Sequence, residues 1–324
     1  MLSEFDLIKQ YFIRPARPAK AQLGIGDDCA LLGMAPGRSF AISSDMLVEG
    51  RHFFPGEDPR RLGHKSLAVN LSDLAAMGAR PVGFTLALAL PAADRDWLAG
   101  FSAGLFALAD EHECELIGGD TTKGPLNICI TVFGEVAPEA ALRRDAARPG
   151  DDVWISGTLG DARLALAAIR GEASLPAEAQ LQAGVRLHTP TPRVALGRLL
   201  AEGGLAHAAI DISDGLVGDL GHILDRSGVG ATLDVDALPA GPMLATQPIA
   251  LRRAWSAAGG DDYELCFTAA PAQRAAILAA GAASNTPVTR VGRIDAAPGL
   301  HLTDGQGRPL ELRLAGFDHF GSGQ

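Results

Sequence analysis

Residues 208–235 read AAIDISDGLVGDLGHILDRSGVGATLDV and decide the fold class of this chain. The aliphatic run Ala208–Ile212 predicts a strand, and Gly215–Ser227 predicts a helix that begins directly after a polar turn. Ala231–Val235 predicts a second strand. A strand, a helix and a strand in close succession are typical of proteins in which helices pack against a sheet.

The alternation of strands and helices continues on both sides of this segment. Further strands are expected at residues 40–45, 82–90, 115–117, 127–136, 153–156, 263–268 and 288–294, and further helices at 62–77, 94–112, 161–170, 191–202 and 272–280. The basic stretch 143–151 is interpreted as the junction of two domains, 1–148 and 149–324, with a simple surface turn as the alternative. The sequence therefore predicts an α/β (or α+β) protein with two lobes.

Composition limits the partners of the protein. The net charge is −10, and no long run of Lys or Arg occurs, which argues against nucleic acid as a partner. An acidic protein still binds phosphates where divalent ions invert the local charge. The four cysteines form no C-x-x-C pair and are typical of a reduced, cytosolic protein. The N-terminus carries no apolar leader, and the longest apolar stretch, 82–90, is too short for a membrane span, so we expect a cytoplasmic protein with no membrane partner.

Six short acidic segments are candidates for one shared site. They are Gly24–Asp28, Ser43–Asp45, Asn70–Asp73, Gly118–Thr122, Asp211–Gly215 and Gly259–Glu264. Mg²⁺ takes oxygen ligands and shares phosphate oxygens with a substrate, and Asp is a short ligand that a turn can aim. Glycines beside the carboxylates let the backbone approach a phosphate. We therefore expect several of these segments to hold metal ions between phosphate groups.

Each segment also has a simpler interpretation. A Gly-Asp or Ser-Asp pair is commonly a turn or a helix cap, and Asp214 stands directly before a predicted helix. Asp73 fits this explanation less well, because it lies within the predicted helix 62–77 on the side of Ser66 and Asn70. That side faces either solvent or a site. One shared site accounts for six segments better than six coincidences do.

Two of the segments share a pattern with each other. Residues 41–45 (AISSD) and 209–214 (AIDISD) are both expected to be aliphatic strands that end in Ser-Asp and point into one cleft. His52 follows the first of these strand ends and is a candidate substrate contact, whereas the other histidines are dispersed and are interpreted as structural or surface residues.

The familiar nucleotide-binding motifs are absent. No G-x-x-x-x-G-K-[ST] occurs, so a P-loop enzyme is excluded. The G-x-G pattern at Gly24 continues into Asp27 and Asp28, which are unfavourable beside a bare pyrophosphate. The protein-kinase motifs are missing as well. Arg144 and Arg148 remain candidates for phosphate contacts, with a solvated basic linker as the alternative.

Taken in order, the acidic segments and their neighbours resemble thiamine-monophosphate kinase. The matching segments are GIGDDCALL (24–32), AISSDMLVEGRHF (41–53), NLSDLAAMGARP (70–81), LIGGDTT (116–122), AIDISDGL (209–216) and GGDDYELCF (259–267), and the match continues to GFDHF (316–320). This family lies in a superfamily with aminoimidazole-ribonucleotide synthetase and selenophosphate synthetase. One segment alone is a weak signal, but six in order cover nearly the whole chain.

The resemblance implies a fold, an activity and a set of binding residues. It implies an N-terminal mixed-sheet lobe that binds ATP and metal and forms a homodimer through its sheet, followed by a C-terminal α/β lobe. It implies Mg²⁺-assisted, direct in-line transfer of the γ-phosphoryl group of ATP to thiamine monophosphate, with no residue acting as a general acid or base. The metal ligands that it implies are Asp28, Ser43, Ser44, Asp45, Asp73, Asp120, Asp211 and Asp214, the ATP contacts are Gly119, Asp120, Arg144 and Ser213, and the thiamine-phosphate contacts are His52, Asp261 and Phe317.

Two positions depart from the family pattern. Asp261 stands where the family often has Glu, so its carboxylate lies one methylene further back, and Phe317 stands where Trp or Tyr is common. Phe still stacks on a cationic thiazolium ring but cannot supply a hydroxyl or indole hydrogen bond. The alternative functions are another ATP-using member of the superfamily, a metal-dependent phosphatase, or a non-catalytic metal or nucleotide sensor.

Overall fold

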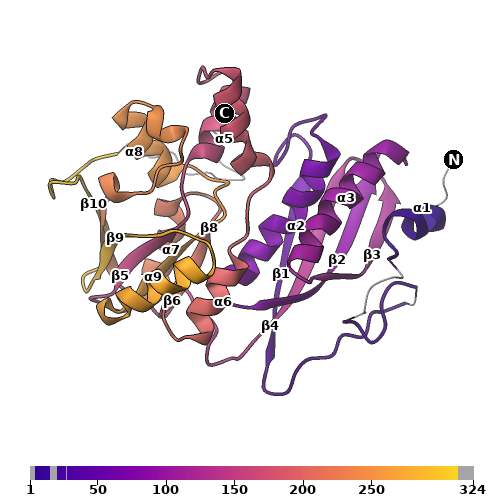
Figure 1. Ribbon diagram of the computed structural model, residues 1–324, viewed down its shortest axis with the longest axis horizontal. Helices are drawn as coiled ribbons and strands as arrows, with labels where there is room; N and C mark the ends of the chain where they lie inside the picture. Colours follow the sequence, from indigo (N-terminus) through magenta and orange to yellow (C-terminus); the bar gives the residue numbers. More distant parts are fainter. Residues whose placement is uncertain (1–3, 15–19, 27, 313–324) are drawn as a thin grey trace. The chain divides into compact units, whose positions relative to one another are not determined.

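The structure of the protein is a computed structural model that describes residues 4–14, 20–26 and 28–312 (Figure 1). The described chain divides into two compact units. The first contains the described residues up to Leu74 together with Ala79–Glu139, and the second contains Ala75–Gly78 together with the described residues from Ala140 onward.

The first unit is built on a four-stranded mixed sheet. Its strands are β1 (Ser39–Val48), β2 (Arg80–Leu90), β3 (Glu115–Lys123) and β4 (Asn127–Val136), in the spatial order β1-β4-β2-β3. Strand β4 runs antiparallel to both neighbours, whereas β2 and β3 are parallel. A parallel pair needs a crossover connection, which the helix α3 (Arg95–Glu111) supplies between β2 and β3. Helices α1 (Glu4–Tyr11) and α2 (Pro59–Ala76) complete the unit.

The core of the first unit lies between one face of this sheet and its helices. Phe84 of β2, Leu67 of α2 and Phe101 of α3 are all fully buried there. Helices α2 and α3 pack closely at Gly104, where an added Cβ would collide with the backbone of Arg60. The opposite face of the sheet is more open, since Ile42, Ser44 and Met46 of β1 are exposed.

The second unit is built on a six-stranded sheet. Its strands are β5 (Asp152–Ser156), β6 (Ala208–Ile212), β7 (Gly230–Asp234), β8 (Glu264–Ala269), β9 (Val288–Asp295) and β10 (Gly299–Thr303), in the order β10-β7-β9-β5-β8-β6. Only the β10–β7 pair is parallel among the described strand pairs of this sheet. Every residue of β5, β6 and β8 is buried, so both faces of the sheet are covered in this region.

Six helices accompany this sheet in the described part of the second unit. They are α4 (Asp161–Ile169), α5 (Ala177–His188), α6 (Val194–Glu202), α7 (Leu216–Ser227), α8 (Ile249–Ala258) and α9 (Arg274–Ala283). Leu216, Leu220 and Ile223 of α7 belong to one core with Ile210 and Ile212 of β6. The apolar stripe that the sequence shows along 215–227 is therefore the face that packs on the sheet.

The mixed α/β class and the two-lobed organisation that the sequence predicts are confirmed. Two predicted strand ends are wrong. Strand β1 continues from residue 45 to Val48, and β3 continues from residue 117 to Lys123. Both strands extend because β4 pairs with β1, and β2 with β3, along their full lengths, so backbone hydrogen bonding overrides the polar and glycine residues. Helices α1, α5 and α8 and strand β10 were not predicted.

A membrane-spanning helix is also not found. In the parts of the chain that the structure describes, each helix is too short or too polar to cross a bilayer.

Candidate functional site

A polar cluster joins strand β1 to helix α2 in the first unit. Ser43 Oγ donates a hydrogen bond of 2.5 Å to Asp73 Oδ2, and the Asp45 backbone N–H donates one of 3.1 Å to Asn70 Oδ1. Asn70 in turn donates to the Ser66 carbonyl at 3.0 Å. The polar side of this helix, which the sequence left open to solvent or a site, thus faces β1. Ser43, Asp45 and Asp73 are brought together.

Ser44 lies on the other face of the same strand. Adjacent strand residues point to opposite faces, and the Ser44 hydroxyl lies 3.0 Å from Thr131 Oγ1 and donates to the Ile130 carbonyl at 3.2 Å. The three residues Ser43 to Asp45 stand within β1 rather than at its end, so the expected likeness to the strand end at 209–214 is wrong in secondary structure. The pleat separates the Ser44 side chain from those of Ser43 and Asp45.

Gly119 and Asp120 lie on the opposite edge strand of this sheet. Asp45 pairs with Ile130, Ile130 with Leu86, and Leu86 with Gly119, which forms one row across four strands. Three strand spacings correspond to about 14 Å between the outer Cα atoms. Gly119 has φ of +150°, and a Cβ there would collide with the Leu86 backbone. A single ion does not span this separation, whereas a polyphosphate with several ions does.

Asp28 and His52 lie in loops of the first unit. Asp28 is exposed in the segment that the Leu23–Leu31 bridge closes. His52 follows β1 and is anchored to it, because its Nδ1 accepts a 3.0 Å hydrogen bond from the Val48 N–H and its own N–H donates to the Val48 carbonyl.

In the second unit, the segments 211–215 and 259–263 lie against each other. The Asp261 N–H donates to the Ser213 carbonyl at 2.8 Å, and the Tyr263 N–H donates to the Ile212 carbonyl at 2.8 Å. Asp261 and Tyr263 have φ of 64° and 50°, a left-handed conformation that non-glycine residues rarely adopt. Two of the six acidic segments are therefore linked through their backbones.

Asp219 holds the 213–215 turn and was not singled out from the sequence. Its Oδ2 accepts hydrogen bonds from the backbone N–H groups of Ser213, Asp214 and Gly215, at 3.0, 3.2 and 3.1 Å. Burial, and secondarily the nearby Asp214 charge, raise the pKa of Asp219 to about 6. The signal was available, because an acidic residue in the first turn of a helix commonly satisfies the N–H groups that begin it.

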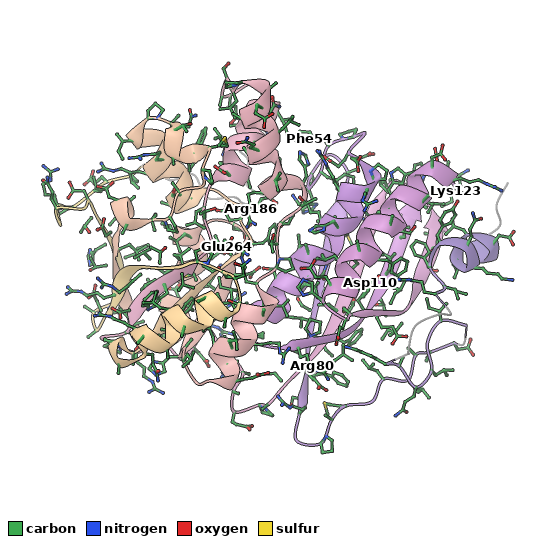
Figure 2. The ribbon with its side chains drawn as sticks, in the orientation of Figure 1. Phe54, Arg80, Asp110, Lys123, Arg186 and Glu264 are labelled. Carbon is green, nitrogen blue, oxygen red and sulfur yellow. The ribbon has the colours of Figure 1, made fainter. Side chains whose placement is uncertain are left out.

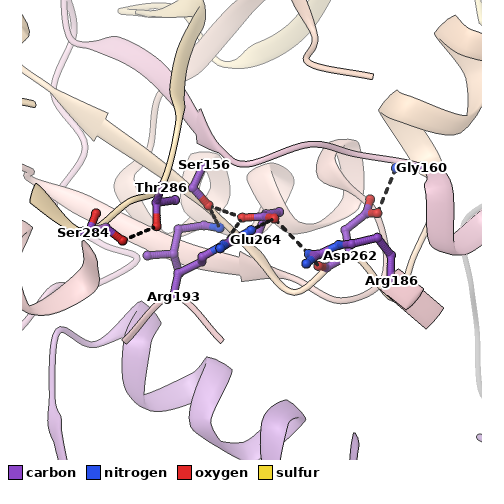
Figure 3. A network of polar contacts seen from close by, with 9 residues as sticks. Ser156, Gly160, Arg186, Arg193, Asp262, Glu264, Ser284 and Thr286 are labelled. Atoms are coloured by element: carbon purple, nitrogen blue, oxygen red, sulfur yellow. Dashed lines mark hydrogen bonds and ion pairs between the residues drawn. The ribbon is translucent and has the colours of Figure 1, made fainter. Parts of the chain in front are cut away.

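A buried ion network lies next to the 259–263 segment (Figure 3). Glu264 is fully buried and accepts hydrogen bonds from Arg193 Nε at 2.6 Å and from Arg186 Nη2 at 2.8 Å. Figure 2 shows Arg186 and Glu264 within the whole chain. Ser156 Oγ also donates to Glu264 Oε2 at 2.6 Å. Arg186 Nη2 donates in addition to the Asp262 carbonyl at 2.6 Å, which ties the network to the 259–263 turn.

Asp262 is the second buried carboxyl group of this turn. Its Oδ1 accepts a 2.8 Å hydrogen bond from the Gly160 N–H. Burial raises the pKa of Asp262 well above its usual range and so favours the neutral acid. The guanidinium groups of Arg186 and Arg193 both face the carboxylate of Glu264.

The remaining predicted residues are placed as follows. Asp211 is buried in β6, Asp214 is exposed after it, and Arg144 is exposed, with its carbonyl accepting a 2.9 Å hydrogen bond from Ser227 Oγ. Phe317 lies outside the described residues. Among the residues that the structure describes, no three His, Cys, Asp or Glu side chains gather closely enough to form a metal site by themselves.

Comparisons with known proteins agree with this arrangement of two domains. Residues 26–136 match the family described as AIR synthase related protein, N-terminal domain, and residues 148–305 match its C-terminal domain. The thiamine-monophosphate kinase of Salmonella typhimurium is 44% identical over 324 residues, which cover 98% of each chain.

Two solved structures show the same similarity. Thiamine-monophosphate kinase from Stenotrophomonas maltophilia is 46% identical, with a TM-score of 0.86 over 95% of this chain and 98% of that one. AaThiL complexed with AMPPCP and TMP is 28% identical, with a TM-score of 0.76 over 89% of each chain. The chain described here therefore belongs to the thiamine-monophosphate kinase family of AIR synthase related proteins.

Proposed function

We propose that this protein transfers the γ-phosphoryl group of ATP to thiamine monophosphate, which yields thiamine diphosphate and ADP, the last step in making that cofactor. The observation that carries the proposal is the 44% identity to a thiamine-monophosphate kinase over 98% of both chains. The complex of AaThiL with AMPPCP and TMP shows that a related protein binds both kinds of ligand.

We further propose Mg²⁺ as the metal cofactor. Ser43, Asp45 and Asp73 offer only hydroxyl and carboxylate oxygens, which is the donor chemistry of a hard divalent cation. The other proposed ligands are Asp28, Ser44, Asp120, Asp211 and Asp214, and of these the Ser44 hydroxyl lies on the opposite sheet face from Ser43 and Asp45. When bound, Mg²⁺ neutralises phosphate charge and orients the phosphate groups.

The residues of the chain have binding roles in this proposal. Gly119, Asp120, Arg144 and Ser213 contact ATP. Gly119 suits this role because its backbone conformation and lack of a Cβ leave its strand without a side chain at that point. Arg144 suits it because its exposed guanidinium group forms planar hydrogen bonds with phosphate oxygens.

His52, Asp261 and Phe317 contact thiamine monophosphate in this proposal. The left-handed backbone of Asp261 supports a binding role, because strained residues cluster at ligand sites. Asp is one methylene shorter than the Glu common in the family, so the fixed backbone sets how far its carboxylate reaches. No residue of the chain is assigned as a general base, because the acceptor oxygen of a phosphate is largely ionised near neutral pH.

We propose a homodimer that forms through the open face of the four-stranded sheet. Ile42 and Met46 of β1 are 60% and 53% exposed on this face. Their partners in the β1–β4 register are Phe133 and Cys129, so apolar rows continue across the two strands. A sheet face with large exposed apolar side chains favours a partner surface of the same kind.

We also propose a cytoplasmic location and a functional boundary at residues 148/149. All four cysteines are free, as expected in a reducing compartment. Burial raises the pKa of Cys114 to about 12, which keeps this thiol protonated and unreactive.

The experiment that tests the proposal incubates purified protein with ATP, Mg²⁺ and thiamine monophosphate and measures thiamine diphosphate by chromatography. Asp45→Asn is expected to abolish product formation while the circular dichroism spectrum is unchanged. Asp96→Asn, on the exposed first turn of α3, is the matched control and keeps full activity. Release of free phosphate without thiamine diphosphate would instead indicate a phosphatase, and a trapped phosphoryl-enzyme from γ-labelled ATP would refute direct transfer.

A further inference from the structure

Three backbone N–H groups in succession converge on one oxygen atom at the start of α7. The donors are Ser213, Asp214 and Gly215, and the acceptor is Oδ2 of Asp219, whose residue is only 4% exposed. Asp219 lies four residues after Gly215, and helix geometry directs its side chain back toward the N-terminal turn. The carboxylate is therefore an internal ligand of this turn.

The same turn is held on its carbonyl side by the 259–263 segment. Asp261 and Tyr263 donate to the carbonyls of Ser213 and Ile212, both at 2.8 Å. A Cβ at Gly260 would lie 2.6 Å from the Ser213 carbonyl oxygen, so the two segments touch without side chains between them. Asp219 thus holds the N–H groups of the 213–215 turn, and the carbonyl of Ser213 in the same turn holds Asp261.

Helix N-termini with free N–H groups commonly bind phosphate. Here Asp219 already takes the N–H groups of residues 213–215, so a nucleotide phosphate would have to displace a carboxylate to reach them. The turn consequently presents the side chains of Ser213 and Asp214, rather than its amides, to a ligand.

We propose that Asp219 is a positioning residue for phosphoryl transfer. It holds Ser213 and Asp214 in position to contact ATP and the metal ion. Through the Ser213 carbonyl it also holds Asp261 in position to contact thiamine monophosphate. This inference rests on the binding roles proposed above for those three residues. Asp219 itself touches neither substrate, because its oxygen is directed at the backbone.

The test compares Asp219→Ala with Asp219→Asn and with a structural control. Asp304 is the control, because it is 5% exposed and its Oδ1 accepts the N–H groups of Gln306 and Arg308 at 3.0 and 2.9 Å. It follows β10, whereas Asp219 follows β6, and these strands are the two opposite edges of the sheet. Asp304→Ala removes the same kind of bond far from the turn.

Asp219→Ala is expected to lower kcat/KM for both substrates about 10- to 100-fold, the usual range for residues that orient ligands from behind, and to raise the Mg²⁺ concentration that gives half-maximal rate. Asp219→Asn is expected to retain most of the wild-type kcat/KM, because its amide oxygen accepts the same N–H groups. Asp304→Ala is expected to lower the melting temperature and leave the kinetic constants of the folded fraction unchanged.

Wild-type kinetic constants in folded Asp219→Ala would overturn the inference, and so would a loss of the same size in Asp304→Ala. If Asp219→Ala does not fold, Asp219→Glu replaces it, because the longer side chain keeps the carboxylate but displaces the turn. Unchanged constants in Asp219→Glu would equally overturn the inference. Asp214→Asn is measured alongside, since full activity in that variant contradicts the proposed binding role itself rather than the role of Asp219.

Discussion

Replacing Glu264 with Gln removes the carboxylate that pairs with both arginines of the buried network while keeping the size of the side chain. Arg186 and Arg193 remain, with side chains that are each only 15% exposed. Each carboxylate oxygen of Glu264 accepts at least two hydrogen bonds. In the glutamine variant one of these oxygens is replaced by an amide nitrogen, which is a donor and faces other donors. The hydrogen bonds to that atom are therefore lost together with the negative charge.

The expected loss follows from leaving two buried guanidinium groups without a counter-ion. Removing one partner from a buried ion pair costs about 3–5 kcal/mol in the free energy of unfolding. For a unit of this size each kcal/mol corresponds to about 2–4 °C, so the melting temperature of the second unit should fall by roughly 6–20 °C.

The assay is thermal unfolding followed by tryptophan fluorescence in a Trp97→Phe background. Trp97 belongs to the first unit, so the remaining signal comes from Trp154 and Trp255 in the second. Trp154 stacks on Phe267, at a centroid distance of 6.3 Å, on the strand that carries Glu264. The probe therefore reports on the perturbed sheet.

Glu202→Gln is the matched control for this prediction. Glu202 pairs with Arg198 at 3.0 Å on α6, but its side chain is 50% exposed, and such pairs contribute about 0–1 kcal/mol. A melting temperature of Glu264→Gln that is no lower than that of Glu202→Gln would refute the reasoning, because the network would then contribute no more than a surface ion pair.

Three further predictions concern other parts of the molecule. Arg253, and secondarily the Gly305 N–H, lower the pKa of Asp236 to about 2, so its contribution is present above about pH 4 and is lost as pH falls toward 2. Asp236→Asn should therefore be less stable than wild type by about 1 kcal/mol in urea titrations at pH 7. This difference in the free energy of unfolding should become smaller below pH 4, and a difference at pH 3 as large as that at pH 7 would contradict the prediction. Met46→Glu should convert the proposed dimer to a monomer in sedimentation velocity, whereas Met46→Leu should not, and a dimer that persists in both variants would contradict the proposed interface. Phe317→Ala should raise KM for thiamine monophosphate more than KM for ATP, and equal increases would argue that this side chain only packs.

The sequence predicted the strand–helix alternation well where apolar periodicity is strong. Strands β4 and β6 have the predicted bounds, 127–136 and 208–212. Helix α5 was missed because Leu181 and Val185 are 62% and 56% exposed, so the apolar pattern along that helix does not mark a buried stripe.

For the candidate site, too, the sequence determined some features and the tertiary structure determined others. The sequence alone determined which residue types gather in which segments, and the ordered acidic motifs were sufficient to indicate a family, since carboxylates, hydroxyls and glycines carry their chemistry wherever the chain folds. It also marked Asp73 as an unusual helix residue.

Only the tertiary structure decided how these residues are held. The contact of Ser43 with Asp73 joins a strand to a helix, and the bond from Asp261 to Ser213 joins segments far apart in the chain. The two arginines on Glu264 have no sequence signature of their own, because hydrogen-bond geometry and burial between distant segments arise only when those segments pack. The sequence therefore specified the chemistry of the acidic segments, and the packing of helices on sheets decided which of them are in contact.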